Sequence, residues 1–359
     1  MQITKYIIFS LAIVSCLSLV ENRETSIQKK LILNQFMNGN TKQLFKVWHL
    51  IFNKEYNYNT EEGIQKYKNF KANVQKIKEH NAKGKSYNMA LHHMSDLTYE
   101  EFKNYYHLKE IKPKQMKKFI DTNFVSLDDY EDEDDDEESN DVDKKRKAVS
   151  WESNMQAVRN QGSCGSCWAF TTMSVIEGQI AISKTIDLTG WLSTQQLVDC
   201  DSSNNGCDGG WFEGAIDYFK DNGPTYDSDY LYEAEQKACR YVADKALPYR
   251  VKKFKSATNA NRVYNFLKKG PVAVAIDAND DFMNYSSGIW DAECSTEVNH
   301  AVTLVGYGVE GKVGYWIIRN SWGEDWGLKG HIWVKENASN SNSCNIELYG
   351  YIPVEKKQK

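Results

Sequence analysis

The sequence predicts an α+β protein in which a helical half is followed by a half rich in short strands. Three observations predict this class: apolar residues at helical spacing in the first third of the chain, an apolar stretch without proline that begins at Cys167, and short β-type runs separated by glycine-rich turns beyond Pro271. The chain has 359 residues, of which 41% are hydrophobic and 13% aromatic, which is enough for about two or three domains with a real core.

Residues 1–20 have the pattern of a secretory signal peptide. Lys5 supplies a short basic region, and the apolar run from Tyr6 to Val20 is too short to span a bilayer comfortably. A membrane anchor formed by the same segment is the alternative, and no later apolar stretch approaches its length. We therefore expect the secretory pathway, ending in secretion or in a lysosome or vacuole, and no other membrane span.

Residues 21–127 are expected to be helical. Two groups of apolar residues recur there at helical spacing and predict faces that are buried in a core or used for docking. The first group is Leu44, Phe45, Trp48, Ile51 and Phe52, and the second is Ile64, Tyr67, Phe70, Val74 and Ile77.

Residues 128–147 are expected to be a linker between two domains. Residues 128–143 contain 12 Asp and Glu in 16 positions, and four basic residues follow directly at 144–147. A block of like charge repels itself and favours disorder, although a solvated loop within one domain is an alternative. Every cysteine beyond Cys16 lies after this segment, which favours the domain boundary.

Net charge also changes at the linker. Residues 1–127 carry 20 Lys and Arg against 11 Asp and Glu, a balance of +9, whereas residues 148–359 carry 20 against 26, a balance of −6. Opposite charges favour association of the two parts near neutral pH. As carboxylates are protonated near their ordinary pKa of about 4, this attraction weakens, so acid is expected to help separate the parts.

After the linker, residues 167–182 predict a buried helix, because Phe170, Met173, Ile176 and Ile180 occur there without an intervening proline. The later short runs predict strands at Val272–Ile276, Ala301–Val305 and Tyr315–Arg319.

The cysteine count predicts one unpaired thiol. Cys16 lies in the signal segment, and seven cysteines follow the linker: Cys164, Cys167, Cys200, Cys207, Cys239, Cys294 and Cys344. Cysteines pair in the oxidising secretory pathway, and an odd number leaves one thiol free or paired between chains. A reactive thiol is therefore expected.

Cys167 and His300 are the candidates for thiol chemistry. Only two histidines follow the linker, and His331 is expected to be structural, whereas His300 begins a run that predicts a rigid strand. Cys167 stands where a glycine-rich loop turns into a helix. The amides at a helix N-terminus and a neighbouring imidazolium stabilise a thiolate, which predicts a nucleophile at neutral or mildly acidic pH.

The stretch QGSCGSCWAF at 161–170 resembles the signature of the papain and cathepsin L family of cysteine peptidases. Three further blocks resemble the same family: NGCDGG at 205–210, NHAVTLVGYG at 299–308 and YWIIRNSWGEDWG at 315–327. The resemblance implies a papain-like peptidase domain over residues 148–359, with a helical left lobe, a β-barrel-like right lobe and an active-site cleft between them. It also implies a cysteine endopeptidase made as an inactive precursor.

The resemblance implies roles for individual residues. Cys167 would be the nucleophile and His300 the base and acid, with Asn320 accepting a ring N–H of His300 and Trp322 shielding that bond. Gln161, through its side-chain amide, and the backbone N–H of Cys167 would form the oxyanion hole. The substrate-binding positions implied are Gly209, Gly210, Trp211, Phe212, Ala275, Asn299, Ala301, Trp322 and Tyr349. The bulky Tyr349 predicts a shallow second pocket that prefers Val or Leu at P2.

The resemblance also implies three disulfides, although the residues alone leave other connectivities open. The implied pairs are Cys164–Cys207, Cys200–Cys239 and Cys294–Cys344. In the secretory pathway, the sequons that begin at Asn284 and Asn337 are candidates for glycosylation.

Residues 21–127 resemble the inhibitory propeptide of the same family, and residues 128–147 would contain the processing site. The spaced E, R, F, N, I, N pattern of that propeptide is matched, with Lys in place of Arg, by Glu62, Lys66, Phe70, Asn73, Ile77 and Asn81. A second propeptide motif, G-x-N-x-F-x-D, survives as Ala90, His92, Met94 and Asp96.

Two other functions remain as alternatives: a non-catalytic binding homologue, and an inhibitor made of the first domain alone. A binding homologue usually lacks the cysteine or the histidine, and both are present here. No loop insertion separates Cys207 from Cys239 of the kind that makes some relatives exopeptidases. The expected partners are protein and peptide substrates and the chain's own propeptide. We expect a monomer without cofactor, metal or nucleic acid.

Overall fold

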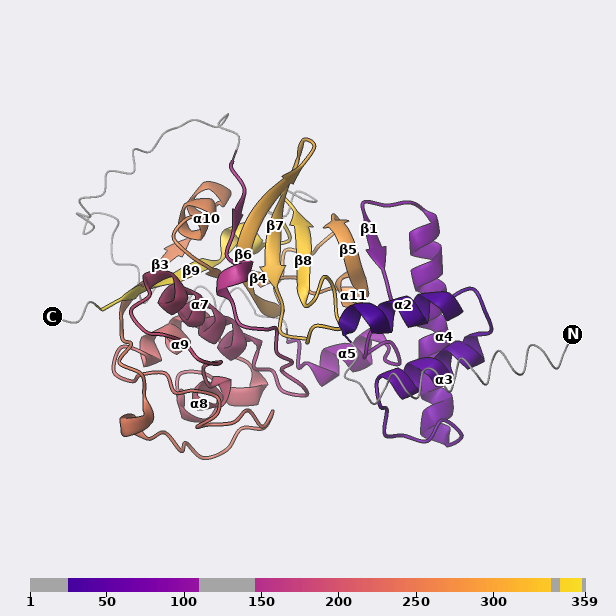
Figure 1. Cartoon of the computed structure of the whole chain (residues 1–359), viewed down its shortest axis with the longest axis horizontal. Helices are drawn as coiled ribbons and strands as arrows, with labels where there is room; N and C mark the ends of the chain where they lie inside the picture. The colour runs from indigo at the N-terminus through magenta and orange to yellow at the C-terminus, as the bar shows by residue number, and fades with distance from the viewer. Residues whose placement is uncertain (1–24, 110–145, 337–342, 357–359) are drawn as a thin grey trace, which may run out of the picture.

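The computed structural model describes residues 25–109, 146–336 and 343–356 (Figure 1). The predicted signal peptide and nearly all of the predicted linker lie outside the described residues. The described chain forms a first part, residues 25–109, and a second part with a helical lobe and a sheet lobe. No helix within these ranges combines the length and the apolar content needed to cross a bilayer.

The first part consists of four helices and a short strand. They are α2 (Ser26–Phe36), α3 (Thr41–Ile51), α4 (Glu61–Ala82), β1 (Tyr87–Met89) and α5 (Tyr99–Tyr105). Thr25, Asn40, Thr60 and Thr98 each begin a helix by accepting a backbone N–H of its first turn. The two predicted apolar stripes meet where the rings of Phe45 and Trp48 each lie 5.1 Å from that of Phe70.

The prediction that Ile64 belongs to the buried face of the second stripe was wrong. Ile64 leaves 49% of its surface exposed, whereas Gly63 beside it is buried. A Cβ on Gly63 would lie 2.3 Å from the carbonyl oxygen of Asn57, so the loop before α4 packs directly against this turn. At its first turn, α4 therefore buries the side that carries Gly63 and exposes Ile64 to solvent.

The helical lobe is built around a single buried helix, α7. Its helices are α7 (Cys167–Ser183), α8 (Thr194–Cys200) and α9 (Phe212–Tyr218), with one-turn helices η2 (Glu152–Asn154), η3 (Gly206–Asp208) and η4 (Ala243–Lys245). Residues are buried on every face of α7, as expected for a helix that is apolar all round. The helix predicted over 167–182 is confirmed and ends one residue later, where Lys184 takes a left-handed conformation.

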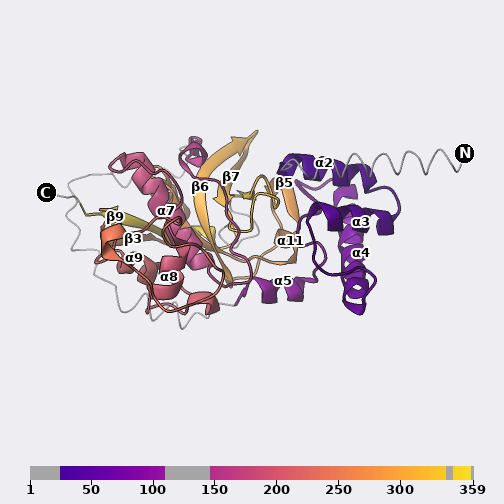
Figure 2. The same ribbon diagram turned by 60° about the horizontal axis from the view of Figure 1, so that its bottom comes forward.

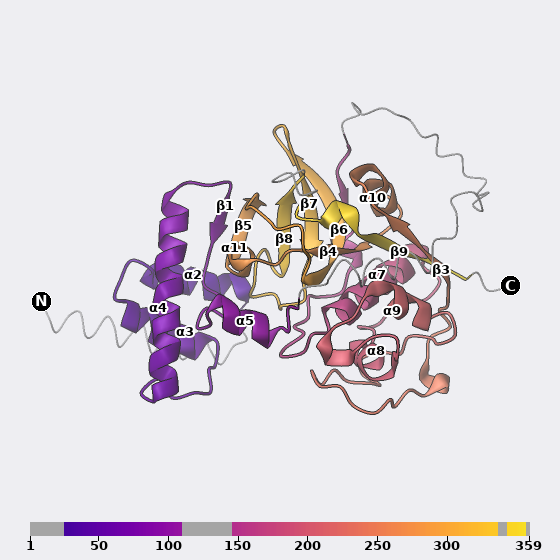
Figure 3. The same cartoon turned by 180° about the vertical axis from the view of Figure 1, so that it is seen from behind.

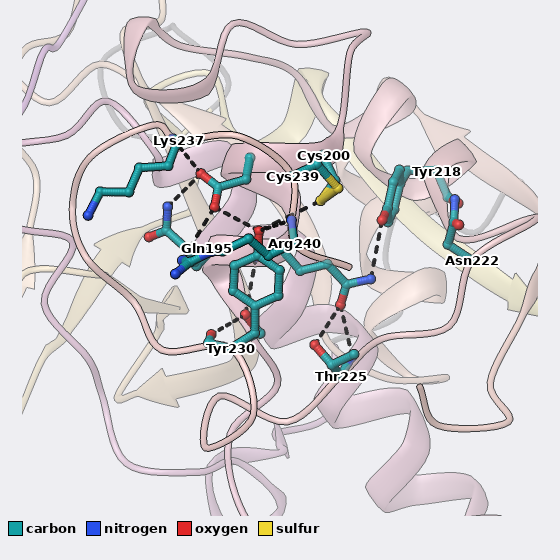
Figure 4. Close-up of a disulfide and its surroundings, with 12 residues drawn as sticks. Gln195, Cys200, Tyr218, Asn222, Thr225, Tyr230, Lys237, Cys239 and Arg240 are labelled. Carbon is teal, nitrogen blue, oxygen red and sulfur yellow. Dashed lines mark hydrogen bonds and ion pairs between the residues drawn. A yellow bond between two sulfur atoms is a disulfide. The ribbon is translucent and has the colours of Figure 1, made fainter. Parts of the chain in front are cut away.

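Disulfides hold the less regular segments of the second part. The structure pairs Cys164 with Cys207, Cys200 with Cys239 and Cys294 with Cys344, which are the pairs that the family resemblance implies. Figure 4 shows the Cys200–Cys239 bond among polar side chains. Beside it, the Asp199 side chain is enclosed and accepts hydrogen bonds from the Tyr230 hydroxyl at 2.8 Å and the Gln195 amide at 2.8 Å. This network fixes a loop that has little regular structure of its own.

The sheet lobe contains the remaining strands. They are β2 (Val149–Ser150), β3 (Val251–Ala257), β4 (Val272–Ile276), β5 (Tyr285–Trp290), β6 (His300–Glu310), β7 (Val313–Arg319), β8 (His331–Lys335) and β9 (Gly350–Glu355). Short helices connect them: α10 (Ala260–Leu267), α11 (Asp280–Met283) and η6 (Ile346–Leu348). The three predicted strand runs are confirmed, as β4 and as the cores of β6 and β7.

The strands form an open path in the order β1-β5-β8-β7-β6-β4-β9-β3, with β2 added beside β6. Only β5 and β8 are parallel neighbours on this path. No pairing among the described strands joins β3 to β1, so the lobe expected to be barrel-like is an unclosed sheet. Its edge strand β1 comes from the first part of the chain, as Figure 3 shows.

Two contacts between elements position the site. Helix α7 packs against β6 and β4, which brings the beginning of the helix to the sheet lobe (Figures 1 and 2). In the sheet, Ile276 at the end of β4 pairs with His300 at the beginning of β6. The predicted thiol and the predicted imidazole therefore lie on two elements that pack directly against each other.

Candidate active site

Cys167 is the first residue of α7 and the free cysteine of the described chain. The loop before it is held to Cys207 by the Cys164–Cys207 disulfide and by a hydrogen bond of 2.8 Å from the Gly165 amide to the Cys207 carbonyl. Gly165 is required for this approach, because a Cβ there would lie 2.5 Å from the same carbonyl oxygen. The described contacts include no side-chain cap on α7, so the first amides of the helix remain open to the thiol.

His300 is held by Asn320, which follows the end of β7. The Nε2 atom of His300 lies 2.7 Å from Oδ1 of Asn320, and this oxygen also accepts the Ser321 backbone N–H at 2.8 Å. Oδ1 of Asn320 is an amide carbonyl oxygen and has no hydrogen to donate, so Nε2 of His300 carries the proton that it shares with Asn320. In the neutral ring the proton acceptor is then Nδ1, which is buried without a hydrogen-bond partner in the described residues.

Trp322 covers the pair of His300 and Asn320. Its ring stacks on the imidazole with a centroid separation of 4.7 Å and an interplanar angle of 23°, and it is almost completely buried. A ring stacked in this way keeps water from the hydrogen bond between the two side chains. The geometry agrees with the shielding that the family resemblance implies.

The thiol and the imidazole are both desolvated in this structure. Burial raises the pKa of the Cys167 thiol, while backbone groups of Ala301, Trp168 and Cys167 itself act in the opposite direction. Burial lowers the pKa of His300 to about 4, and its hydrogen bond with Asn320 acts in the opposite direction. Both shifts favour the neutral thiol and the neutral imidazole in this closed form.

The first part of the chain packs beside the residues that hold the thiol and the imidazole. Phe102 and Tyr106, on and just after α5, both pack on Trp322 with centroid separations of 4.9 Å. The chain then passes Gly165, whose added Cβ would lie 2.9 Å from Cβ of His107. An ion pair of 2.9 Å between Lys109 and Asp208 follows on the helical lobe. This segment thus crosses from the His300 side of the site to the Cys167 side, consistent with the place of α5 in Figures 2 and 3.

Gln161 has a fixed side chain beside the loop that carries the thiol. Its Nε2 donates to the Cys164 carbonyl at 2.9 Å, and its Oε1 accepts the Ser321 hydroxyl at 2.6 Å. The Tyr232 hydroxyl also donates to the backbone carbonyl of Gln161 at 2.6 Å. Ser321 and Tyr232 were not singled out from the sequence. Ser321 stands between Asn320 and Trp322 in the sequence, and this position between two predicted site residues could have identified it.

Two of the predicted substrate-binding positions, Phe212 and Tyr349, pack against Trp211. Tyr349 meets its ring edge-on at 5.9 Å and remains partly exposed, and Phe212 packs behind it at 4.6 Å and is fully buried. Ala275 and Ala301 are buried neighbours on the paired strands β4 and β6. The side chain of Asn299 is occupied, because its Oδ1 accepts the Ala278 amide at 2.8 Å.

Gly209 and Gly210 connect η3, which ends at Asp208, to Trp211. Gly209 has φ 108°, a conformation that favours glycine. A Cβ on Gly210 would lie 2.5 Å from Oδ1 of Asn204, so this backbone packs too closely for a side chain.

Glu213, which follows Phe212 in α9, is a buried carboxyl group that was not among the predicted site residues. Burial raises its pKa to about 7, and a hydrogen bond with Tyr351 acts in the opposite direction. The rings of Phe212 and Tyr351 lie 5.5 Å apart, which connects the carboxyl group to the residues around Trp211.

The structure argues against one of the two glycosylation candidates in this closed form. Asn284 is completely buried, and its carbonyl accepts the backbone N–H of Ala90 from the first part at 3.1 Å. A glycan on its side chain has no exit, because that side chain is enclosed between the two parts. Asn337 lies outside the described residues.

The described ranges contain no cluster of metal-ligating side chains. No group of three or more His, Cys, Asp or Glu side chains there is arranged to hold a metal ion.

Known proteins resemble both parts of the chain. The family described as "Papain family cysteine protease" matches residues 139–354, and the one described as "Cathepsin propeptide inhibitor domain (I29)" matches residues 45–102. The chain is 36% identical to cysteine protease XCP2 of Arabidopsis thaliana over 88% of this chain and 86% of that protein. It is 34% identical to a cathepsin L-like proteinase of Fasciola hepatica over 88% and 94% of the respective chains. The solved structure of digestive procathepsin L 3 from the larval midgut of Tenebrio molitor superposes with a TM-score of 0.73 at 33% identity, covering 88% of this chain and all (100%) of that one.

Proposed function

Because the chain belongs to the papain family of cysteine proteases, we propose that it is an endopeptidase that hydrolyses peptide bonds through an acyl-enzyme on Cys167. The observation that carries this proposal is the orientation of His300. Its Nε2 is engaged by Asn320 at 2.7 Å, which leaves Nδ1 as the proton acceptor beside the helix that begins with the thiol. Gln161, Trp322 and the residues around Trp211 complete the proposed site.

In the proposed reaction, Nδ1 of His300 accepts the proton of Cys167, and the thiolate attacks the carbonyl carbon of the substrate. The oxyanion that forms is held by the Gln161 amide and by the backbone N–H of Cys167. The imidazolium then donates its proton to the leaving amine, which gives an acyl-enzyme and the first product. Water, activated by His300, attacks the thioester and releases the second product and the free thiol.

The first part of the chain acts as an inhibitory propeptide in this proposal, with residues 21–127 blocking the site and residues 128–147 containing the processing site. Three groups of contacts support it. Strand β1 extends the sheet beside β5, the aromatic residues at the end of α5 cover Trp322, and the segment after α5 crosses to Asp208. A substrate cannot occupy the same path while these contacts persist.

Acid is proposed to release the propeptide. Lys76 of α4 pairs with Asp280 at 2.7 Å and with Asp281 at 3.2 Å, and Lys29 of α2 pairs with Asp325 at 2.8 Å. Each pair joins a propeptide lysine to a carboxylate of the peptidase domain. Protonation of the carboxylates removes these attractions, while the lysines stay charged.

The secretory pathway is the proposed location, with secretion or a lysosome or vacuole as the destination. The three disulfides support an oxidising compartment. We further propose a monomer whose partners are protein and peptide substrates and its own propeptide.

Alkylation of the matured protein tests the proposed function against a non-catalytic binding homologue. Iodoacetamide should modify Cys167 at one equivalent per chain, and hydrolysis of a fluorogenic peptide should fall in proportion to the modified fraction. A protein with a modified Cys167 and unchanged peptidase activity would contradict the proposal. Inhibition of the matured protein by added residues 21–127 then separates the peptidase from a protein that serves only as an inhibitor.

A further inference from the structure

A cage of three aromatic rings surrounds Arg146, the third residue of the basic run at 144–147. Its guanidinium carbon lies 5.6 Å from the ring centre of Tyr264, 5.9 Å from that of Tyr307 and 5.5 Å from that of Trp316. The rings come from α10, β6 and β7, so three separate elements converge on one side chain. This is the geometry in which the faces of aromatic rings bind a cation.

Polar groups complete the cage. The guanidinium forms an ion pair with Glu336 and donates to Oδ1 of Asn261 at 2.7 Å. The other carboxylate oxygen of Glu336 accepts the Tyr307 hydroxyl at 2.6 Å, so Glu336 is oriented by the cage itself. Only 16% of each of the Arg146 and Glu336 side chains remains exposed. A planar guanidinium can use rings, a carboxylate and an amide at once, whereas a lysine ammonium is a single charged point.

The backbone after Arg146 is bound as closely as its side chain. The Tyr264 hydroxyl contacts both the amide and the carbonyl of Lys147, at 3.0 and 2.9 Å. Val149 and Ser150 then pair with β6 as strand β2, and the Trp151 indole donates to the Leu267 carbonyl at 2.7 Å. Every residue from Arg146 to Trp151 except Ala148 thus has a named contact with the sheet lobe or α10.

We propose that Tyr264, Tyr307, Trp316 and Glu336 form an arginine-binding cage that keeps Arg146 and Lys147 on the peptidase domain when the linker is cut. A peptidase must draw several residues on each side of the scissile bond into its cleft as an extended strand. The peptide bonds after Arg146 and after Lys147 cannot enter the cleft of a peptidase, because the side chain of Arg146 and the backbone of Lys147 are already bound. Cleavage within the basic run therefore occurs before Arg146, and the arginine remains as an anchor at the new N-terminus.

Limited trypsin digestion of the full-length Cys167→Ala precursor tests the cage without self-cleavage. Trypsin cuts after lysine and arginine, so all four basic positions are chemically suitable. Mass analysis of the C-terminal product should give chains that begin at Arg146 or earlier. Chains that begin at Lys147 or Ala148 as the main early product would overturn the proposal.

The variant Arg146→Lys keeps the charge and the trypsin site but removes the planar group. Cleavage after position 146 should become at least about fivefold faster, as should cleavage in Glu336→Gln, which loses the carboxylate of the cage. Glu310→Gln, on β6 but outside the cage, is the matched control and should digest like the parent. Equal rates after position 146 in the parent and Arg146→Lys, with unchanged melting temperatures, would show that the cage does not protect the bond.

Discussion

His300 and Asn320 are joined by a hydrogen bond of 2.7 Å in which only the histidine can donate. This single contact determines which ring nitrogen is left to accept the proton of Cys167. It also connects the strand β6 to the residue after β7, so the orientation of the imidazole depends on the register of the two strands. The proposed chemistry consequently depends on a side chain that does not touch the substrate.

Replacing Asn320 should therefore impair the reaction without removing the base. In Asn320→Ala the imidazole can rotate and change its tautomer, and kcat/KM should fall by about 10- to 100-fold. The loss should appear mainly in kcat, because no contact with the substrate is removed. Asn222→Ala, which loses an asparagine hydrogen bond to the Tyr218 carbonyl far from the site, is the control and should leave both constants unchanged. Unchanged kcat in Asn320→Ala would refute the positioning role.

The ion pair between Lys76 and Asp281 should delay activation of the precursor until the pH falls. Burial alone would raise the pKa of Asp281, but Lys76 and the Tyr87 hydroxyl outweigh it and hold the pKa below its usual value. A lowered pKa means that the contact stabilises the closed form above the usual Asp range and is lost as pH falls through the lowered value. Asp281→Asn should thus activate about two- to fivefold faster at pH 6. Asp221→Asn serves as the control, and equal rates for Asp281→Asn and the parent would contradict this explanation.

Glu213 should make the peptidase domain less stable above neutral pH. Burial raises its pKa to about 7, so the folded state favours the protonated form. The stability gained from this form is fully present below the ordinary Glu pKa and is lost as pH rises through about 7. Glu213→Gln should raise Tm at pH 8 by roughly 1–3 °C and have a smaller effect at pH 5. A Tm difference that is the same at both pH values would exclude titration of this carboxyl group as the cause.

Tyr349 should limit the depth of the second substrate pocket. Its ring meets Trp211 edge-on at 5.9 Å, and it bears no charge that could pair with a basic side chain. We expect the parent to prefer Val or Leu at P2, and Tyr349→Ala to shift the preference about 10-fold toward Phe as the floor is lowered. A peptide library profiles both enzymes. Preference for Arg at P2 in the parent would contradict this assignment.

Local pattern was sufficient to predict the elements that carry the site. Helix α7 carries apolar residues at helical spacing and has no proline, so residues 167–182 could be recognised as a buried helix. Strand β4 reads VAVAI and is buried at every position, which suits its central place in the sheet. A helix or strand of this kind is determined by residues that are close together in the sequence. The structure therefore contains both elements where they were predicted.

Features that depend on distant contacts could not be predicted in the same way. The burial of Asn284 requires the docked propeptide, and the rings around Arg146 come from three elements whose contact no periodicity shows. Ile64 fitted a helical stripe but lies outside because the preceding loop packs on Gly63. Burial likewise raises the pKa of Cys167 and lowers that of His300 in the closed form, and spacing in the sequence does not show this burial.

The most direct test of the central proposal is turnover of a fluorogenic peptide by the matured Cys167→Ala protein, produced by adding an external peptidase that is then removed. Near-identical circular dichroism and Tm would establish that the fold is intact. The proposed acyl-enzyme predicts that kcat falls by at least about 10⁴-fold, to the background of the assay. Substantial residual hydrolysis by the purified variant would contradict the assignment of Cys167 as the nucleophile.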